Sequence, residues 1–311
     1  MTSSKKKIRL AILGAGGIGK VHARIFHKLG VDICAVLGST KESSQKVAQS
    51  LNSAYGIQAQ PFDCLEILLK KTKPDAVSIC TPPKLHFEQI ISAFNDCVAV
   101  FCEKPLFWED NMTPLLLEKK LALIKNHSYR RLYVNTSNAS LVDTILPMLE
   151  NRNKINSFIF RFFTQGRNQY QNIAVDLLPH ACSLLLKLLP SSIPQQLKQK
   201  IAVNHYSCSF DYGNCLVKFD FQEQTNGPKL FEFIINRRCF TRVQKGDGDT
   251  YKVYLHDSLT KSNILTDDPF VVYIKKFIVF CKNGILHEKD QFNEAASNMR
   301  LMTKILFNNY D

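Results

Sequence analysis

Residues 8–19 read Ile-Arg-Leu-Ala-Ile-Leu-Gly-Ala-Gly-Gly-Ile-Gly, and this stretch decides the fold. A short apolar run stops at a glycine cluster, and a helical pattern begins at once. Gly14, Gly16 and Gly19 form the pattern G-x-G-x-x-G directly after a predicted strand and at the start of a predicted helix. In that context the pattern indicates a dinucleotide-binding turn.

Each glycine of the pattern has its own physical reason. Gly14 lets the chain turn tightly, Gly16 lets the backbone approach a pyrophosphate, and Gly19 lets helix and strand pack closely. The free N–H groups and the positive end of the helix dipole attract phosphates, and Gly17 and Ile18 of this turn are also predicted cofactor contacts. The alternative is an ordinary glycine-rich turn between a strand and a helix.

Length and composition indicate an ordinary globular protein of about two domains, since the chain has 311 residues. No apolar run is long enough for a membrane span, and the polar, basic start does not resemble a signal peptide. The ten cysteines form no C-x-x-C pair, so a disulfide framework or zinc site is not expected. We therefore expect a cytoplasmic protein without a membrane partner.

The formal net charge of +13 is spread along the chain, and Lys5-Lys6-Lys7 is its one run of three basic residues. Without a basic stripe interleaved with aromatic residues, a nucleic-acid groove is not expected. A solvated basic surface is the first interpretation. Attraction of a phosphorylated substrate or cofactor is the second.

Short apolar strands alternate with amphipathic helices through the first half of the chain, which predicts a doubly wound parallel sheet, the Rossmann fold. Ligands of such sheets collect at the carboxyl ends of the strands. Residues 81–83 and 103–105 fall at two such ends. The predicted strands are 8–13, 33–37, 76–80, 98–102 and 132–135, and the predicted helices are 18–29, 63–71, 85–94 and 113–125.

The end of the second strand bears on the choice of cofactor. Rossmann folds that bind NAD usually place a carboxylate there for the ribose hydroxyls. Here Ser39, Thr40 and Lys41 follow the strand, and the first carboxylate is Glu42. Two hydroxyls and an ammonium suit a 2′-phosphate, so the sequence favours NADP over NAD, although a plain polar loop would leave the choice undecided.

Two motifs at strand ends carry a resemblance to a known family. Residues 80–86 read Cys-Thr-Pro-Pro-Lys-Leu-His, and residues 101–106 read Phe-Cys-Glu-Lys-Pro-Leu. With the glycine turn, they resemble the Gfo/Idh/MocA oxidoreductases, the family of glucose–fructose oxidoreductase and inositol dehydrogenase.

The resemblance implies roles for residues at both motifs. Lys104 would contact cofactor and substrate and assist proton transfer, and the bond to Pro105 is often cis in relatives. Glu103 would lie near the nicotinamide ribose, and the residues around the cofactor would include Thr81, Pro82 and His86. From the residues alone, Lys104 is equally well an exposed lysine in a turn.

A second domain is expected to begin after the last parallel strand, giving domains 1–136 and 137–311. Beyond Pro190 the strands 201–210, 215–221, 230–236 and 239–243, separated by turn residues, predict an α+β domain on a mostly antiparallel open sheet. The resemblance implies a homodimer or homotetramer formed through this sheet. It also implies an Arg-Phe pair near residues 135–140, where this chain has Asn-Thr-Ser-Asn-Ala-Ser, so a basic substrate contact is missing or supplied from elsewhere.

Asp176 and His180 are four residues apart and share one face if the stretch is helical. Pro179 is tolerated only in a first turn, which makes Asp176 a candidate helix N-cap and His180 a candidate buried histidine without chemistry. In the family that the chain resembles, Asp-x-x-x-His is the second characteristic motif, and Asp176 and His180 match it. His180 would be the general acid/base, because the pKa of imidazole suits proton exchange at neutral pH, and Asp176 would orient it and the substrate hydroxyl.

Two features of this second motif limit what is expected of it. Many relatives carry a further aspartate where this chain has Ser183. No third ligand stands near Asp176 and His180, so no metal site is predicted.

Together these features predict an oxidoreductase that moves a hydride between NAD or NADP and a carbinol or carbonyl of a small polyhydroxylated substrate: a sugar, sugar derivative or cyclitol. Lys104, Asp176 and His180 would form its catalytic set. One alternative is a non-catalytic NAD(P)-binding regulatory or interaction protein, since fold does not fix function. Another is an enzyme that recycles a tightly bound NAD(H).

Overall fold

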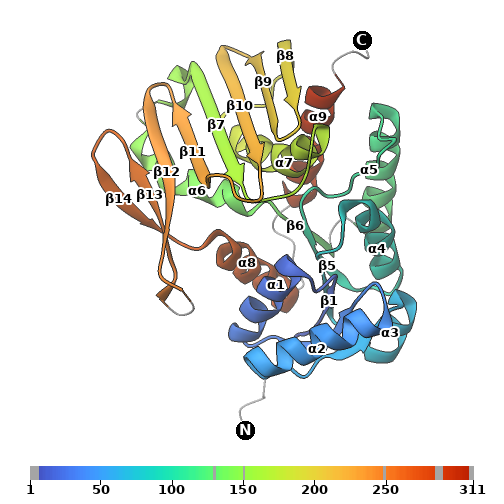
Figure 1. The fold of residues 1–311 in the computed structure, drawn as a ribbon. Coiled ribbons are helices and arrows are strands. Elements are labelled where there is room, and N and C mark those ends of the chain that lie inside the picture. The colour runs from blue at the N-terminus through green and yellow to red at the C-terminus, as the bar shows by residue number, and fades with distance from the viewer. Residues whose placement is uncertain (1–6, 129–130, 150, 248–249, 284–289, 308–311) are drawn as a thin grey trace. The chain divides into compact units, whose positions relative to one another are not determined.

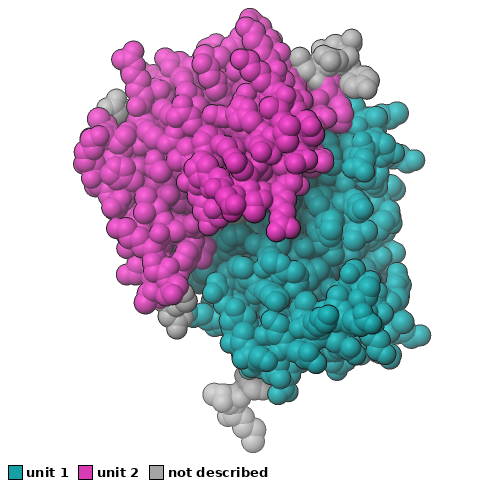
Figure 2. Space-filling view, viewed as in Figure 1, with its two compact units in different colours: residues 1–135, 270–296 teal, residues 136–269, 297–311 magenta. Residues whose placement is uncertain are grey.

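The computed structural model describes residues 7–128, 131–149, 151–247, 250–283 and 290–307. The chain divides into two compact units, coloured separately in Figure 2. Unit 1 comprises residues 1–135 and 270–296, and unit 2 comprises residues 136–269 and 297–311. The first unit is therefore made of two separate segments of the chain, because residues 270–296 return to it.

Unit 1 is built on a six-stranded sheet in the order β3-β2-β1-β4-β5-β6, with every neighbouring pair parallel (Figure 1). From β1 the chain adds β2 and β3 on one side, and then β4, β5 and β6 on the other. Folds of this kind bind ligands at the carboxyl ends of the strands where the order changes sides, here β1 and β4. The doubly wound parallel sheet is confirmed. Its strands are β1 (Arg9–Leu13), β2 (Asp32–Leu37), β3 (Gln60–Phe62), β4 (Ala76–Ile79), β5 (Ala99–Glu103) and β6 (Leu132–Asn135).

The helices of unit 1 differ from the expected ones in two places. Helix α2 was not predicted because it buries only Ser44 and Leu51 and has no continuous apolar face. Helix α3 begins after Cys64, whose Sγ contacts Glu66 Oε2 at 3.1 Å, rather than with the capping box expected at Asp63. The bounds are α1 (Gly17–Lys28), α2 (Lys41–Tyr55), α3 (Leu65–Thr72), α4 (Pro83–Asn95) and α5 (Pro114–Ser128).

Helix α8 (Pro269–Asn283) explains why unit 1 takes a late segment of the chain. The ring centroid of Phe277 lies 5.2 Å from that of Phe101 on β5, and the centroid of Tyr273 lies 6.0 Å from that of Tyr133 on β6. These side chains are buried in the core of unit 1. Burial of this apolar helix face therefore completes the core of the parallel sheet.

Unit 2 is built on an eight-stranded sheet in the order β14-β13-β12-β11-β7-β10-β9-β8. Only the β7–β10 pair is parallel, so the expectation of a mostly antiparallel sheet is confirmed. The predicted strand 201–210 is two strands, because a turn at residues 203–204 separates β8 from β9. The strands are β7 (Ser157–Thr164), β8 (Pro194–Ala202), β9 (His205–Tyr212), β10 (Cys215–Glu223), β11 (Leu230–Ile235), β12 (Arg238–Lys245), β13 (Lys252–Asp257) and β14 (Ser262–Thr266).

Helix α7 (Gln171–Leu188) packs on the face of this sheet formed by β7, β9 and β10 (Figure 1). Pro179 is the ninth residue of the helix and lies in its interior, so the expectation of a first-turn proline was wrong. Asp176 is consequently not the N-cap, which is Tyr170. The remaining helices are α6 (Ser140–Ile145) and α9 (Asp290–Leu306), and among the described residues none of the helices is long and apolar enough to cross a membrane.

Candidate functional site

The glycine turn after β1 has the geometry of a dinucleotide-binding turn. Gly14 has a φ of +81°, and a Cβ at this position would lie 2.7 Å from the backbone nitrogen of Thr81. A Cβ on Gly19 would lie 2.3 Å from the carbonyl oxygen of Gly14. In contrast, a Cβ on the exposed Gly16 or Gly17 would meet no atom within 4 Å. The turn is therefore closely packed toward the sheet and open on the side where a pyrophosphate would approach the helix N-terminus.

Behind this turn lies a buried ion pair between α1 and β5. His22 Nε2 lies 2.8 Å from Glu103 Oε1, and the same oxygen accepts a hydrogen bond of 2.6 Å from Asn135 Nδ2. Burial alone would lower the pKa of His22, but Cys80 and Glu103 outweigh it and raise the pKa to about 10. Burial would raise the pKa of Glu103, but His22, Lys104 and Asn135 together lower it. The charged pair thus holds β5 in place directly before Lys104.

These contacts change the role expected for Glu103. Its side chain is buried, Oε1 faces His22 and Asn135, and Oε2 accepts a hydrogen bond of 3.3 Å from the backbone N–H of Lys104. Such a carboxylate positions the loop after β5. The contact with a nicotinamide ribose that the resemblance implies stays a prediction.

His86 joins the two loops at the carboxyl ends of β4 and β5. The side chain is fully buried, with Nε2 at 2.7 Å from the carbonyl oxygen of Thr81 and Nδ1 at 3.0 Å from that of Pro105. Burial lowers the pKa of His86, so the neutral ring donates to one of these carbonyls. The Lys104–Pro105 peptide bond is cis, as the resemblance implies. His86 therefore shapes both loops from behind, while Thr81 and Pro82 remain partly or fully exposed.

The residues expected to select the cofactor lie at the start of α2. The hydroxyl of Thr40 accepts a hydrogen bond of 3.1 Å from the N–H of Ser43 and so caps the helix. Ser39 and Lys41 are exposed beside this N-terminus. The Thr40 hydroxyl accepts in the cap and keeps its own O–H as a donor, so Ser39, Thr40 and Lys41 all stay candidates for a 2′-phosphate.

In unit 2, helix α7 presents Asp176 and His180 one turn apart, with both side chains partly exposed. Asn138 Nδ2 lies 2.8 Å from His180 Nδ1, and Arg242 Nη1 donates to Asn138 Oδ1 over 3.3 Å. A guanidinium can only donate, so the amide oxygen faces Arg242 and the amide nitrogen faces His180. His180 Nδ1 consequently accepts, and the neutral ring carries its proton on Nε2.

Asp176 is paired with a second carboxyl group that the sequence did not single out. Glu223 at the end of β10 is buried, forms a side-chain hydrogen bond with Asp176, and accepts from Asn168 at 2.9 Å and 3.1 Å. A Cβ on Gly166 would lie within 2 Å of Glu223 Oε2, so this approach requires glycine. Burial and the neighbouring Asp176 raise the pKa of Glu223. Glu223 therefore holds a proton more readily than an ordinary glutamate does.

Ser183, at the position of the aspartate found in many relatives, donates to the carbonyl oxygen of His180 over 2.8 Å within α7. Its hydroxyl thus stabilises the helix near His180 instead of supplying a second carboxylate. The structure places Lys104 in unit 1, and Asp176 and His180 in unit 2. Their convergence on one substrate stays a prediction.

Comparison with known proteins agrees with the geometry of unit 1. Residues 8–128 match the model of a family described as an oxidoreductase family with an NAD-binding Rossmann fold, Gfo/Idh/MocA. This match supports a Gfo/Idh/MocA oxidoreductase over the part of the chain that forms most of unit 1. D-glucoside 3-dehydrogenase from Escherichia coli K12 is 36% identical over 107 residues, and inositol 2-dehydrogenase from Rhizobium meliloti is 34% identical over 99 residues. These matches cover 34% and 32% of this chain and 28% of each relative.

Solved structures of similar fold extend over both units. A 3-ketoreductase from Actinomadura kijaniata, in complex with TDP-benzene and NADP, aligns over 97% of this chain and 98% of its own, with a TM-score of 0.72 and 15% identity. Myo-inositol 2-dehydrogenase from Lactobacillus plantarum aligns over 97% and 96%, with a TM-score of 0.71 and 15% identity. At these identities the likeness shows the fold alone.

The sequence did not predict the residues that hold the two site segments. Three unpredicted residues, His22, Asn138 and Glu223, each contact a predicted site residue from a distant part of the chain, and Arg242 holds Asn138 in place. Of these residues, only Asn138 lies in residues 135–140, where the chain lacks the Arg-Phe pair that the resemblance implies. No spacing in the sequence could have revealed the others.

Proposed function

We propose that this chain is an NAD(P)-dependent oxidoreductase acting on a carbinol or carbonyl carbon of a sugar, sugar derivative or cyclitol. The proposal depends on two features that occur together in this chain. An open glycine turn in the Gfo/Idh/MocA unit accompanies a helix that presents Asp176 and His180 one turn apart. The nicotinamide, when bound, accepts or supplies the hydride, while the side chains orient the substrate and move the proton.

In this proposal His180 Nε2 exchanges the proton of the substrate oxygen, and Lys104 of unit 1 assists at the same oxygen. Asp176 orients the substrate. With Asn138 as arranged, neutral His180 donates a hydrogen bond through Nε2. Taking up a proton at Nε2 requires the other tautomer, in which Nδ1–H faces the oxygen of a reversed Asn138 amide. The bond from Arg242 to Asn138 opposes that reversal and favours the donor form of the ring.

The cofactor proposed is NADP in preference to NAD, because Ser39 and Lys41 are exposed at the N-terminus of α2 and the end of β2 carries no carboxylate. Lys41→Ala should then weaken NADPH binding about two- to fivefold, the usual size for one exposed charge, and leave NADH binding unchanged. Lys46→Ala, an exposed lysine on the same helix, is the matched control. Equal effects of both variants would refute the assignment.

The test of activity measures nicotinamide absorbance with purified protein, either cofactor, and a panel of sugars and cyclitols. Lys104→Ala and His180→Ala should abolish turnover while fluorescence titration still shows cofactor binding. Lys119→Ala, an exposed lysine of α5, should retain both. Cofactor binding without turnover of any panel member would favour a regulatory protein. If the cofactor stays bound during gel filtration, and substrate is converted without a net change in nicotinamide absorbance, the enzyme recycles a tightly bound cofactor.

We further propose a cytoplasmic homo-oligomer that associates through the sheet of unit 2. All ten cysteines are free, which suits a reducing compartment. Light scattering coupled to gel filtration measures the oligomeric state, and a monomer at micromolar concentration would refute the assembly.

A further inference from the structure

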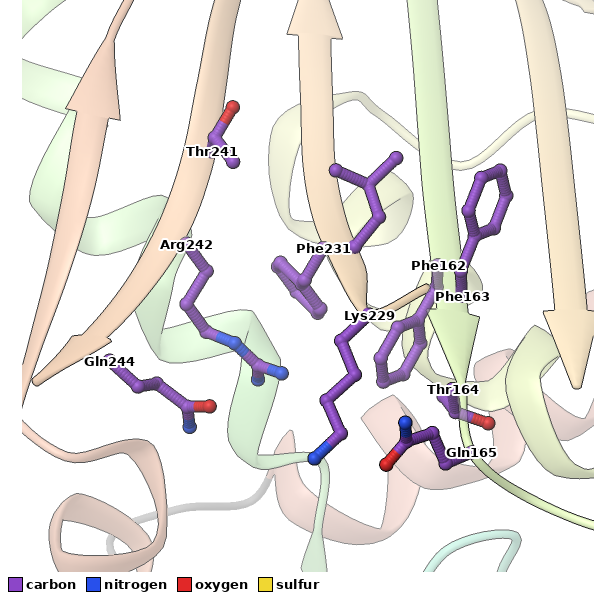
Figure 3. Close-up of a pocket in the computed structure, with 10 residues that line it drawn as sticks. Phe162, Phe163, Thr164, Gln165, Lys229, Phe231, Thr241, Arg242 and Gln244 are labelled. Carbon is purple, nitrogen blue, oxygen red and sulfur yellow. The ribbon is translucent and has the colours of Figure 1, made fainter. Parts of the chain in front are cut away.

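A pocket of about 280 Å³ lies in unit 2 beside the His180 network (Figure 3). It is formed at the carboxyl end of β7, the start of β11 and the end of β12. Its size is slightly below the usual range for ligand pockets, about 300–1,000 Å³, so it fits one substituent or ring rather than a large ligand. The lining residues that bear on the ligand are Phe162, Gln165, Lys229, Phe231, Arg242 and Gln244.

The charge of this pocket is one-sided. It contains the cations Arg242 and Lys229, and none of its lining residues, all within the described part of the chain, is acidic. In Figure 3 the side chains of Arg242, Lys229, Gln244 and Gln165 extend into the same space. Gln165 Nε2 already donates to the carbonyl oxygen of Gly227, and Gln244 Nε2 donates to the Tyr251 hydroxyl. The two cations are therefore the main donors available to a ligand.

Arg242 is held in a largely apolar setting. Its guanidinium lies 4.1 Å from the ring centroid of Phe231 and 5.8 Å from that of Phe162. Burial lowers the pKa of Arg242 to about 10, against the opposing effects of Tyr251 and Asp268, so the group stays charged at neutral pH. Among the described residues it donates one hydrogen bond, to Asn138, although a guanidinium has five N–H donors. Arg242 is partly exposed, so a ligand can reach this surplus of donors, and hydrogen bonds from a charged guanidinium to an anion are the stronger kind.

The pocket and the proposed catalytic residue share a neighbour, Phe162. Phe162 lines it and also packs edge-on against His180, with 5.4 Å between the ring centroids. Arg242 reaches His180 through a single residue, Asn138. A ligand group in the pocket would therefore belong to the same molecule whose oxygen meets His180.

We propose that this pocket binds an anionic group of the substrate, a carboxylate or a phosphate, through Arg242 and Lys229. The inference rests on the proposed function and narrows its substrate class to acidic sugar derivatives. It also assigns the basic substrate contact that residues 135–140 lack: Arg242 supplies it from β12.

The test is a binding measurement on the full chain loaded with NADP. Titration calorimetry compares glucose, glucuronate, glucose 6-phosphate and a nucleoside diphosphate glucose, which separates a carboxylate, a phosphomonoester and a diphosphate as the anion. At least one acidic ligand should bind about tenfold or more tightly than glucose, as one or two hydrogen bonds to a charged group provide. Equal affinity for glucose and all three acidic ligands would overturn the proposal.

Variants then locate the anion. Lys229→Gln should weaken binding of the acidic ligand about two- to fivefold without changing glucose binding. Arg242→Leu should weaken binding of the acidic ligand about tenfold or more. Lys218→Gln removes the same charge from an exposed position of β10 outside the pocket and should have no effect. If Lys229→Gln and Lys218→Gln weaken binding equally, the effect comes from general charge and the proposal fails. Lys229→Gln keeps the test valid even if Arg242→Leu does not fold.

The readout also separates this inference from the proposed function. Tight binding of an acidic sugar without hydride transfer would leave the pocket assigned and refute the oxidoreductase. Turnover of neutral sugars with no preference for an acidic one would retain the oxidoreductase and refute the anion site.

Discussion

The glycine turn allows a direct test of whether the chain binds a dinucleotide, through two single-methyl substitutions with different expected effects. In Gly16→Ala the added Cβ meets no protein atom within 4 Å, but it occupies the side of the turn from which a pyrophosphate would approach. In Gly19→Ala the added Cβ lies 2.3 Å from the carbonyl oxygen of Gly14. The first substitution therefore acts on the ligand alone, and the second acts on the fold.

The magnitudes follow from these contacts. In Gly19→Ala, α1 and the turn must separate by about 1 Å to restore ordinary contact at 3.4 Å, at an overpacking cost of about 1–3 kcal/mol. For a unit of this size that cost lowers Tm by about 2–12 °C. In Gly16→Ala the same steric cost of about 1–3 kcal/mol falls on the complex, which weakens cofactor binding by about 5- to 150-fold.

The assay combines thermal unfolding without ligand and fluorescence titration with NADPH and NADH. Gly16→Ala should keep the unfolding temperature of the parent protein and lose most of its cofactor affinity, whereas Gly19→Ala should lose both. Gly16→Ala protein that binds both cofactors as tightly as the parent would refute the assignment of this turn to the pyrophosphate.

Three further predictions concern the core, the buried ion pair and the proposed catalytic histidine, His180. Phe277→Ala should destabilise unit 1 by about 3–5 kcal/mol in urea unfolding, whereas Val279→Ala on the exposed side of α8 should change it little; equal effects would contradict the packing of α8. The pKa of His22 is raised to about 10 in the folded protein, against 6.5 when unfolded. The charged His22 therefore stabilises the fold fully below pH 6.5, and this stabilisation is lost toward pH 10. We expect Tm to fall between these pH values, and to fall less in His22→Leu. The lowered pKa of Glu103 adds a contribution that is present above about pH 4.5 and is lost on acidification; a Tm that stays constant from pH 6.5 to 9 would refute the ion pair. In Asn138→Asp the new carboxylate can accept a hydrogen bond from His180 Nδ1–H. This variant should therefore move the acid limb of the pH–rate profile for oxidation to higher pH than Asn138→Ala does. Identical profiles of the two variants would rule out that residue 138 controls the tautomer of His180.

Local patterns predicted much of the architecture because they report local physics. Glycines at 14, 16 and 19 indicate a turn whose atoms are all within a few residues of one another, and the structure has that turn. The alternation of apolar strands and helices predicted the parallel sheet, and the alternation beyond residue 190 predicted the antiparallel one. Where the local pattern was weak, as in α2, or a proline suggested a helix start, as at Pro179, the prediction missed or misplaced the element.

Tertiary packing decided the features that depend on distant residues. The sequence by itself determined the glycine turn, the strand ends that carry Lys104, and the helical spacing of Asp176 and His180. Only the folded chain brings Glu223 to Asp176, and Asn138 with Arg242 to His180. Arg242 and His180 are 62 positions apart in the chain, and no local periodicity records that β12 pairs with β11 beside β7. Protonation states and the charge of a pocket depend on such neighbours, because burial and nearby charges act through space and not along the chain.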